Sequence, residues 1–364
     1  MLEFRLLAGA LFAAAAATTI ALPCAGQTTL TNPLLSSGPD PWVITRDGNY
    51  YFMCSTGSSL TIRKTRRIED LSQATPHVVW TPPATGPYSH DIWAPELHYL
   101  RGKWYIYFAA DAGTNMTHRI YVVENPSEDP TEGSWTFKGK VADRSDKWAI
   151  DATVFENRSR LYMAWSGWEG DTNGRQDIYL AELSNPWTVK SDRVRVSTSD
   201  YPWERVGDRK LPYVAGQYPP TDPVEPTHVD VNEGPEFLAH GDKVFLIYSA
   251  NGCWTDFYSL AMLEASATAD LLQPSAWKKH SLPVFAYSPG SHAFGPGHNG
   301  FFQSPDGRQD WIIYHANPES GQGCGGHRSP RAQPFTWNAD GTPDFGTPVA
   351  IGTPIAAPSG EQRP

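Results

Sequence analysis

Five segments of the chain share one pattern of apolar and polar positions. Each opens with a polar or small residue, continues as an apolar run, turns at a short polar segment and returns as a run rich in aromatic side chains. Apolar runs of about four to eight residues bounded by turn residues are typical of buried strands. Each segment therefore predicts a β-hairpin, and the hairpins begin at Asp40, Ala94, Asp151, Glu233 and His298.

The predicted turns support this interpretation. Four of the five hairpins carry a glycine at the turn, in the pairs Asp47-Gly48, Arg101-Gly102, Gly241-Asp242 and Asp306-Gly307. Short hairpin turns need a positive φ, which glycine adopts without strain. Successive hairpins are far enough apart for two further strands, and residues 120–123, 178–181 and 258–263 fit as third strands.

Five repeats of about four antiparallel strands predict an all-β protein folded as a five-bladed β-propeller. A β-sandwich needs fewer strands, and the chain lacks the GH…WD signature of WD40 repeats. In a propeller, the first strand of each blade lines the central channel. The polar residues that open the repeats are therefore expected around one funnel: Asp40, Asp151, Glu233 and His298.

Residues 1–26 have the pattern of a secretory signal peptide. Arg5 precedes an apolar run over residues 6–17, and small residues follow. The run is too short and too rich in alanine for a membrane-spanning helix. We expect an exported protein, secreted or periplasmic, with residues 27–364 as a single catalytic domain. A lipid anchor on Cys24 is the alternative, although Pro23 stands where a small residue is expected.

Composition narrows the class of ligand. Aromatic residues make up 12% of the 364 residues, and charged residues make up only 19%. Exposed aromatic rings suit sugars, whose C–H faces stack on them. The net charge of −10 argues against nucleic acid, because a binder neutralises phosphates with clustered Lys and Arg.

Three cysteines follow the predicted signal peptide, so at most one internal disulfide is expected. Cys253 and Cys324 lie in glycine-rich loops and are the expected pair, with two free thiols as the alternative. Cys54 lies in a strand-like segment. No CxxC or HExxH motif supports a zinc site.

Carboxylates at three repeat openings indicate glycoside hydrolysis. In that reaction one protonated carboxyl group gives its proton to the departing oxygen, and a second carboxylate attacks the anomeric carbon or deprotonates a water. A third carboxylate nearby raises the pKa of the acid, because like charges resist joint ionisation. Alone, Glu233 would be interpreted as a solvated loop charge; the repeat brings it together with Asp40 and Asp151.

The chain resembles glycoside hydrolase family 43 over residues 38–352. The resemblance implies that Asp40 is the general base, that Asp151 tunes the pKa of the acid and positions groups, and that Glu233 is the general acid of an inverting mechanism. It rests on SGPDPWV around Asp40, SHDIWAPELHYLRGKWYIYFAA from Ser89, AIDATVF around Asp151, VNEGPEFL around Glu233, GPGHNGFF around His298 and RAQPFTWNADGTPDFGTP from Arg331.

The resemblance also implies ligand contacts. His298 corresponds to a histidine that helps hold a metal ion, often Ca²⁺, largely through water; a neutral histidine without metal is the alternative. Calcium prefers oxygen ligands, so any ion is expected to be structural or electrostatic rather than catalytic. His90 and Trp93 are expected at the substrate, with packing as the alternative for Trp93. Arg331 resembles a substrate-facing arginine, with a surface position as the alternative.

The segments PWE at Pro202, VNEGPEFL and SANGCWTDFYSL look most like those of α-L-arabinofuranosidases. The resemblance therefore favours hydrolysis of arabinose-containing plant polysaccharide or oligosaccharide, with β-xylosidase second and endo-arabinanase third. A sugar-binding or protein-binding propeller without catalysis is the alternative of another class, but it would not need acids at three openings. Residues 201–227, rich in proline and aromatic residues, are expected to form a loop that shapes the pocket.

Overall fold

The computed structural model describes residues 28–207 and 228–361, and the predicted signal peptide lies outside them. Within these ranges the chain is all-β, with short 3₁₀ turns as its only helices. No helix in this part of the chain is both long and apolar enough to span a bilayer.

The strands form five consecutive groups, called units I to V here. Unit I contains β2 (Trp42–Arg46), β3 (Asn49–Met53), β4 (Leu60–Thr65) and β5 (Pro76–Trp80). Unit II contains β6 (His90–Leu100), β7 (Lys103–Asp111), β8 (Arg119–Asn125) and β9 (Thr136–Lys140). Unit III contains β10 (Ala149–Asn157), β11 (Arg160–Gly167), β12 (Arg175–Asn185), β13 (Thr188–Val189) and β14 (Val194–Ser197). Unit IV contains β15 (Asp230–His240), β16 (Lys243–Ala250), β17 (Ser259–Ser266) and β18 (Lys278–Lys279). Unit V contains β19 (Phe294–Gln303), β20 (Asp310–Asn317), β21 (Ser329–Trp337) and β22 (Pro343–Asp344).

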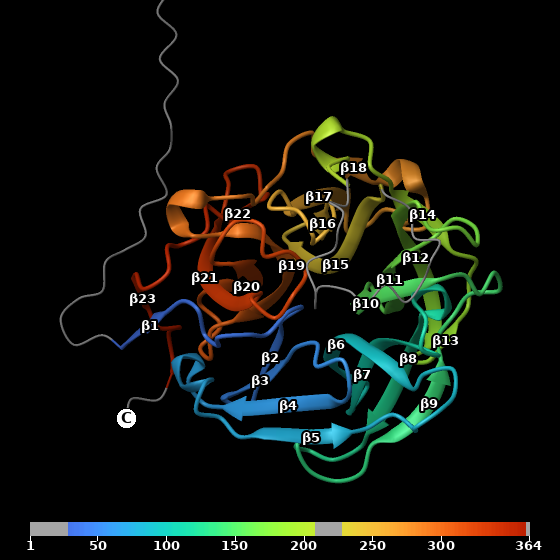
Figure 1. Ribbon diagram of the computed structural model, residues 1–364, viewed down its shortest axis with the longest axis horizontal. Coiled ribbons are helices and arrows are strands. Elements are labelled where there is room, and N and C mark those ends of the chain that lie inside the picture. The colour runs from blue at the N-terminus through green and yellow to red at the C-terminus, as the bar shows by residue number, and fades with distance from the viewer. Residues whose placement is uncertain (1–27, 208–227, 362–364) are drawn as a thin grey trace, which may run out of the picture.

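The units follow one another around a common centre, with β2, β6, β10, β15 and β19 innermost (Figure 1). Units I, II and V are separate four-stranded antiparallel sheets. Units III and IV form one nine-stranded sheet, because β12 pairs in parallel with β15 at Arg175–Asp230 and Gln176–Val231. The sequence pattern did not predict this junction. All three predicted third strands are confirmed by β8, β12 and β17, and β17 begins one residue after the predicted start.

Three of the four glycine-containing turns join their strands with two residues, as predicted. The turn that contains Gly307 is longer and spans residues 304–309. Unit III makes its tight turn without glycine, because Arg158 and Ser159 adopt φ of 49° and 67°. A glycine therefore marks most of these turns but is not required at every one.

Apolar side chains fill the spaces between consecutive units. Separate buried clusters lie between units I and II, II and III, III and IV, and IV and V. A fifth cluster packs unit V against unit I, with Trp311 and Ile313 against Tyr50 and Phe52. Burial of these side chains is the main source of stability for the arrangement.

The N-terminal segment is fastened to unit V before it reaches Asp40. Strand β1 (Thr29–Thr31) pairs with β23 (Pro354–Ala356). The Asn32 side chain exchanges two hydrogen bonds with the backbone of Ala332, at 2.9 and 3.0 Å. Leu34 and Gly38 donate backbone hydrogen bonds to the carbonyl groups of Pro330 and Arg328. The position of Asp40 is therefore set by unit V as well as by unit I.

A disulfide links the loops after β16 and β20, between Cys253 and Cys324, and Cys54 is free. The predicted pairing is confirmed. The bridge joins units IV and V at the end where their innermost strands begin.

Candidate active site

Each innermost strand has a backbone irregularity at its opening, which in unit I lies two residues before the strand. A residue with positive φ occurs at Asp40, Ala94, Asp151, Gly234 and His298. In units II to V the strand register shifts at the same place. Bulges of this kind re-aim side chains, and backbone strain of this kind concentrates at functional sites.

These openings surround a cavity of about 490 Å³. Asp40, Asp151, Glu233 and His298 all line it, as the repeat pattern predicted. The three carboxyl groups come from units I, III and IV, and the imidazole comes from unit V.

Asp40 lies among groups that favour its ionised form. Its carboxylate accepts hydrogen bonds from Ser55 Oγ at 2.5 Å and from Arg328 Nη1 at 2.9 Å. The Nδ1 atoms of His298 and His315 lie 3.4 and 3.6 Å from its Oδ1. Burial raises the pKa of Asp40, but the charge of Arg328, the two imidazoles and the Ser55 hydroxyl outweigh it and hold the pKa well below its usual range. Burial lowers the pKa of both histidines, so Arg328 is the permanent cation.

Glu233 has the opposite environment. Burial, and then the negative charge of Asp40, raise the pKa of Glu233 to about 7. The hydroxyl of Tyr258 donates to Glu233 Oε1 at 2.9 Å and opposes part of this rise. Near neutral pH, Glu233 therefore still has a proton to give while Asp40 is ionised.

Asp151 contacts the backbone beside Glu233. Its Oδ2 accepts a hydrogen bond from the Gly234 N–H at 3.1 Å. Burial, followed by the charges of Glu233 and Asp40, raises the pKa of Asp151 well above its usual range. Like charges oppose each other's ionisation, and the carboxyl groups of Asp151 and Glu233 lie close enough to interact in this way. The hydrogen bond to Gly234 also suits the positioning role expected for Asp151.

Two glycines make room for this arrangement. A Cβ on Gly234, whose φ is +54°, would lie 3.2 Å from the His298 ring. A Cβ on Gly297 would lie 2.4 Å from the Tyr258 ring. Larger residues at these positions would displace the imidazole or the phenol that contacts Glu233.

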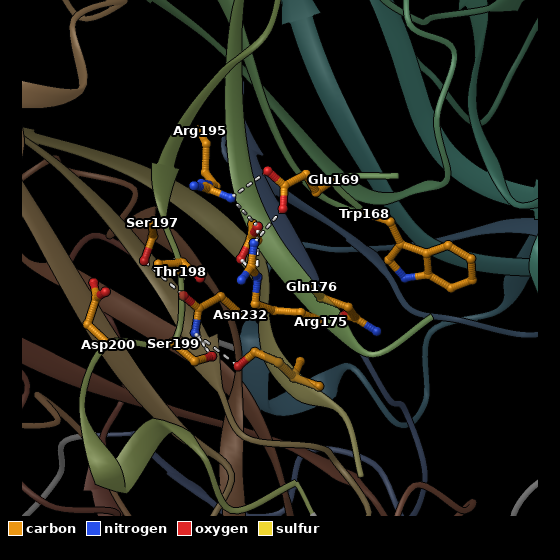
Figure 2. Close-up of polar contacts among 12 residues, drawn as sticks. Trp168, Glu169, Arg175, Gln176, Arg195, Ser197, Thr198, Ser199, Asp200 and Asn232 are labelled. Atoms are coloured by element: carbon orange, nitrogen blue, oxygen red, sulfur yellow. Dashed lines mark hydrogen bonds and ion pairs between the residues drawn. The ribbon is translucent and has the colours of Figure 1, made fainter. Parts of the chain in front are cut away.

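A buried polar network fixes the residue before Glu233. Asn232 Oδ1 accepts from Ser197 Oγ at 2.8 Å, and its Nδ2 donates to Ser199 Oγ at 3.3 Å (Figure 2). The Nδ2 atom also contacts Glu204 at 3.4 Å, and Glu204 is fully buried and paired with Lys279 Nζ at 2.9 Å. Because buried charges are stable only when paired, this network holds the start of β15 rigidly.

The same close-up shows an ion-pair cluster beside the network. Arg175 and Arg195 both contact Glu169, at 2.9 and 3.3 Å (Figure 2). Arg175 lies in β12, next to Gln176, which lines the cavity. The cluster thus lies at the parallel junction between units III and IV.

The donor set around His298 fits a cation. Asp151, Glu233 and His298 each offer a ligand atom, and these atoms lie within 4.8 Å of one another. Burial lowers the pKa of His298, so its imidazole is neutral and able to coordinate. Two carboxyl groups supply the oxygen ligands that calcium prefers.

The predicted substrate contacts are only partly at the cavity. Trp93 lines the cavity, and its indole also stacks on His118 with ring centroids 4.1 Å apart. His90 is exposed and not part of the lining; its Nδ1 lies 2.8 Å from Ser89 Oγ. The next residue, Asp91, lines the cavity instead.

Arg331 was expected to face the substrate or the surface, and both expectations are wrong. Its side chain is fully buried inside β21, pairs across the sheet with Tyr314 and donates to the Ala316 carbonyl at 3.4 Å. Arg328, which lies before β21, reaches the cavity and Asp40. A residue inside a strand is covered by neighbouring units, whereas the preceding loop opens on the cavity.

Several polar and aromatic lining residues from loops or strand ends were not predicted: Asn115, Trp148, Asn173, Gln176, Trp254 and Arg328. Trp254 follows Cys253 in a segment that the sequence analysis singled out, but nothing in the pattern indicated its direction. Of the proline-rich loop, residues 208–227 lie outside the described ranges; within the described part, Pro202–Glu204 form a 3₁₀ turn.

Comparison with known proteins shows consistent similarity. Residues 30–343 match the sequence profile of the glycosyl hydrolases family 43. An extracellular exo-alpha-(1->5)-L-arabinofuranosidase of Streptomyces avermitilis is 36% identical over 342 residues, which cover 92% of this chain and 66% of that protein. Alpha-L-arabinofuranosidase 43 of Humicola insolens is 33% identical over 361 residues, covering 94% and 69%. The crystal structure of an alpha-L-arabinofuranosidase from Lactobacillus brevis matches with a TM-score of 0.78 at 35% identity, covering 89% and 98%.

Proposed function

The chain belongs to glycosyl hydrolase family 43 and is a glycoside hydrolase, and from this premise we propose that it removes α-L-arabinofuranosyl residues from plant arabinan or arabinoxylan. The supporting observation is that Asp40 and Glu233 line one cavity with pKa values shifted in opposite directions. The names of the relatives favour arabinose over xylose.

We also propose that units I to V are the blades of a five-bladed β-propeller within one catalytic domain, residues 27–364. The support is the order of the sheets and the apolar cluster between every pair of consecutive units, including V and I. An experimental structure in which fewer or more than five such strand groups surround the cavity would reject this proposal.

In the proposed mechanism Asp40 is the general base. It takes a proton from a water as the water oxygen bonds to the anomeric carbon. The bond from that carbon to the leaving oxygen breaks, and Glu233 gives its proton to this oxygen. Arg328 keeps Asp40 ionised, and Asp151 positions the backbone beside Glu233. Charge is balanced, because one carboxyl group gains the proton that the other loses.

We propose that the reaction inverts the anomeric configuration. Inverting enzymes hold the two carboxyl groups about 6.5–9.5 Å apart to admit a water, and retaining enzymes hold them at about 5–5.5 Å. Asp40 and Glu233 belong to units I and IV, which unit V separates, and this supports the wider spacing. Proton NMR of the first sugar released tests the proposal: an α-arabinofuranoside should give the β-anomer before mutarotation. A glycosyl group trapped on Asp40, or the α-anomer as first product, would overturn it.

A cation, calcium by the family resemblance, would be held by His298 largely through water, so that Glu233 keeps the proton that the mechanism needs. When bound, it would add positive charge at the base of the cavity. The test is thermal: a chelator should lower the melting temperature, and calcium should restore it, while His298→Ala should show no response to either. An equal response in that variant would place the ion elsewhere.

The substrate assignment is tested with purified protein on aryl α-L-arabinofuranoside, aryl β-D-xyloside and linear arabinan in parallel. We expect hydrolysis of the arabinofuranoside and release of arabinose monomers from arabinan. Faster hydrolysis of the xyloside would favour β-xylosidase, oligosaccharide products from arabinan would favour endo-arabinanase, and binding without hydrolysis would favour a non-catalytic sugar-binding protein.

The word extracellular in the name of a relative supports an exported location, and export is tested by fractionation of the producing cell.

A further inference from the structure

Two aromatic side chains are exposed on unit IV. Phe257 is 52% exposed and Tyr287 is 37% exposed, and their ring centroids lie 5.6 Å apart. Within the described residues, the other large apolar side chains that are similarly exposed are Val78, Met116 and Leu282. The two aromatic ones are thus neighbours, and Phe294 supports Tyr287 with its ring centroid 5.4 Å away. Exposed aromatic rings are unfavourable in water, so two that lie side by side indicate a surface that binds a ligand.

The two residues lie in segments that lead to residues of the cavity wall. Phe257 is in the loop after β16, and Trp254 of the same loop lines the cavity. Tyr287 precedes β19, the strand that brings His298 to the cavity. Leu260 and Phe285 form an isolated β-bridge, which holds the two loops at the same end of unit IV. The two rings therefore lie at the end of unit IV that also contributes Trp254 to the cavity.

The loop that carries Phe257 is held firmly in place. The Cys253–Cys324 disulfide anchors one end, and Asn251 Nδ2 donates to the Phe257 carbonyl at 2.8 Å. Asp256 accepts hydrogen bonds from Gly295 N, at its carbonyl, and from Gly321 N, at its carboxylate, both at 2.8 Å. The exposure of Phe257 is thus a property of an ordered loop, and its ring is already positioned to bind.

We propose that Phe257 and Tyr287 form a carbohydrate platform that stacks on a sugar ring of the polysaccharide beyond the arabinosyl residue held in the cavity. The proposal rests on the proposed function and adds where the rest of the substrate lies. Sugar C–H faces stack on aromatic rings, and Tyr287 adds a hydroxyl for hydrogen bonding. Two rings are far too small for a stable protein interface, which buries about 1,200–2,000 Å². Because the pair lies at the same end of unit IV as the Trp254 wall of the cavity, a carbohydrate chain is the fitting occupant.

The test compares a long and a short substrate. Phe257→Ala and Tyr287→Ala should each raise KM on linear arabinan about 2- to 10-fold, because one aromatic stacking contact contributes that much. Both variants should leave kcat on arabinan unchanged, and should leave kcat/KM on aryl α-L-arabinofuranoside unchanged, since that substrate does not extend beyond the cavity. Phe257→Tyr keeps the ring and should behave as wild type, and Tyr287→Phe should raise KM on arabinan by less than Tyr287→Ala, because it loses the hydroxyl and keeps the ring. Val78→Ala, a 62% exposed side chain in β5 of unit I, is the matched control.

The outcomes separate the two proposals. If wild type fails on aryl arabinofuranoside, the proposed function fails and the platform falls with it. If wild type hydrolyses that substrate but the alanine variants match it on arabinan, only the platform is overturned. Equal losses on both substrates would show that the rings shape the cavity itself, which also overturns the platform.

Discussion

Asp40 and Glu233 stand at corresponding openings of units I and IV, yet their carboxyl groups differ in protonation. The pKa of Asp40 lies well below its usual range, and that of Glu233 is raised to about 7. Both line the same cavity. The repeat therefore brings carboxyl groups together, and something outside the repeat decides which one is ionised.

The difference comes from unit V and its loops. Arg328, His298 and His315 all belong to unit V and all lie within 3.6 Å of the Asp40 carboxylate. Glu233 accepts a hydrogen bond from the neutral hydroxyl of Tyr258, and Arg328 lowers its pKa by less than burial and Asp40 raise it. The direct bond from Arg328 to Asp40 is therefore the main difference that separates the base from the acid.

Replacing either the Asp40 or the Glu233 carboxyl group should cause the largest loss of activity. Glu233→Gln and Asp40→Asn keep side-chain size and remove proton chemistry, so kcat on arabinan should fall about 10²–10⁴-fold in each. A phenol-type leaving group needs less protonation, so an activated aryl arabinofuranoside should partly rescue Glu233→Gln and not Asp40→Asn. Melting temperature and circular dichroism check folding. Rescue of Asp40→Asn instead would exchange the two roles.

Removing the positive charge of Arg328 beside Asp40 should have the second largest effect on activity. Arg328→Met removes the charge that keeps the pKa of Asp40 low, so the pKa rises and the base becomes protonated at low pH. The acid limb of the kcat/KM profile should move to higher pH, and kcat/KM near pH 5 should fall about 10- to 100-fold. Arg308→Met, with a side chain that is 83% exposed, is the control and should keep the wild-type profile. An unchanged acid limb in Arg328→Met would remove Arg328 from this role.

Displacing Glu233 without changing its chemistry should lower kcat by a smaller factor. Asn232→Ala breaks the contacts to Ser197, Ser199 and Glu204. The carboxyl group of Glu233 itself is kept. We expect kcat to fall about 10-fold, because small displacements of a catalytic group are expensive, with KM and the pH limbs little changed. Asn49→Ala, at a site with a local bond to Asp47, is the control. A shifted basic limb in Asn232→Ala would mean that the network tunes the pKa of Glu233 rather than its position.

The sequence indicated the parts of the site that follow the repeat. Apolar runs and turn residues predicted the strands, and the polar residue before each run predicted Asp40, Asp151, Glu233 and His298 at one cavity. This works because strand period and tight turns are local properties of the chain.

The parts that depend on distant contacts could not be predicted in the same way. Arg328 was missed, and Arg331 was favoured, because their difference depends on where β21 begins. Asn232 looked like any strand residue, because its partners Ser197 and Glu204 are distant in sequence. The fusion of units III and IV needs only two residue pairs, too few to leave a pattern.

The smallest expected effect comes from a small change in the pKa of Glu233. Tyr258→Phe keeps the ring, which stacks on His315, and removes the hydroxyl that donates to Glu233. That hydrogen bond favours the ionised form, so its loss should raise the pKa of Glu233 further above about 7. The acid must be protonated to act, so the basic limb of the kcat profile should move to higher pH. Activity below pH 6 should change less than about 3-fold, because the acid is already protonated there. Tyr88→Phe in unit II controls for loss of a hydroxyl elsewhere. A basic limb that stays in place, or moves to lower pH, would mean that the limb reports a group other than Glu233, and the contrast between the two openings would then need another proton donor.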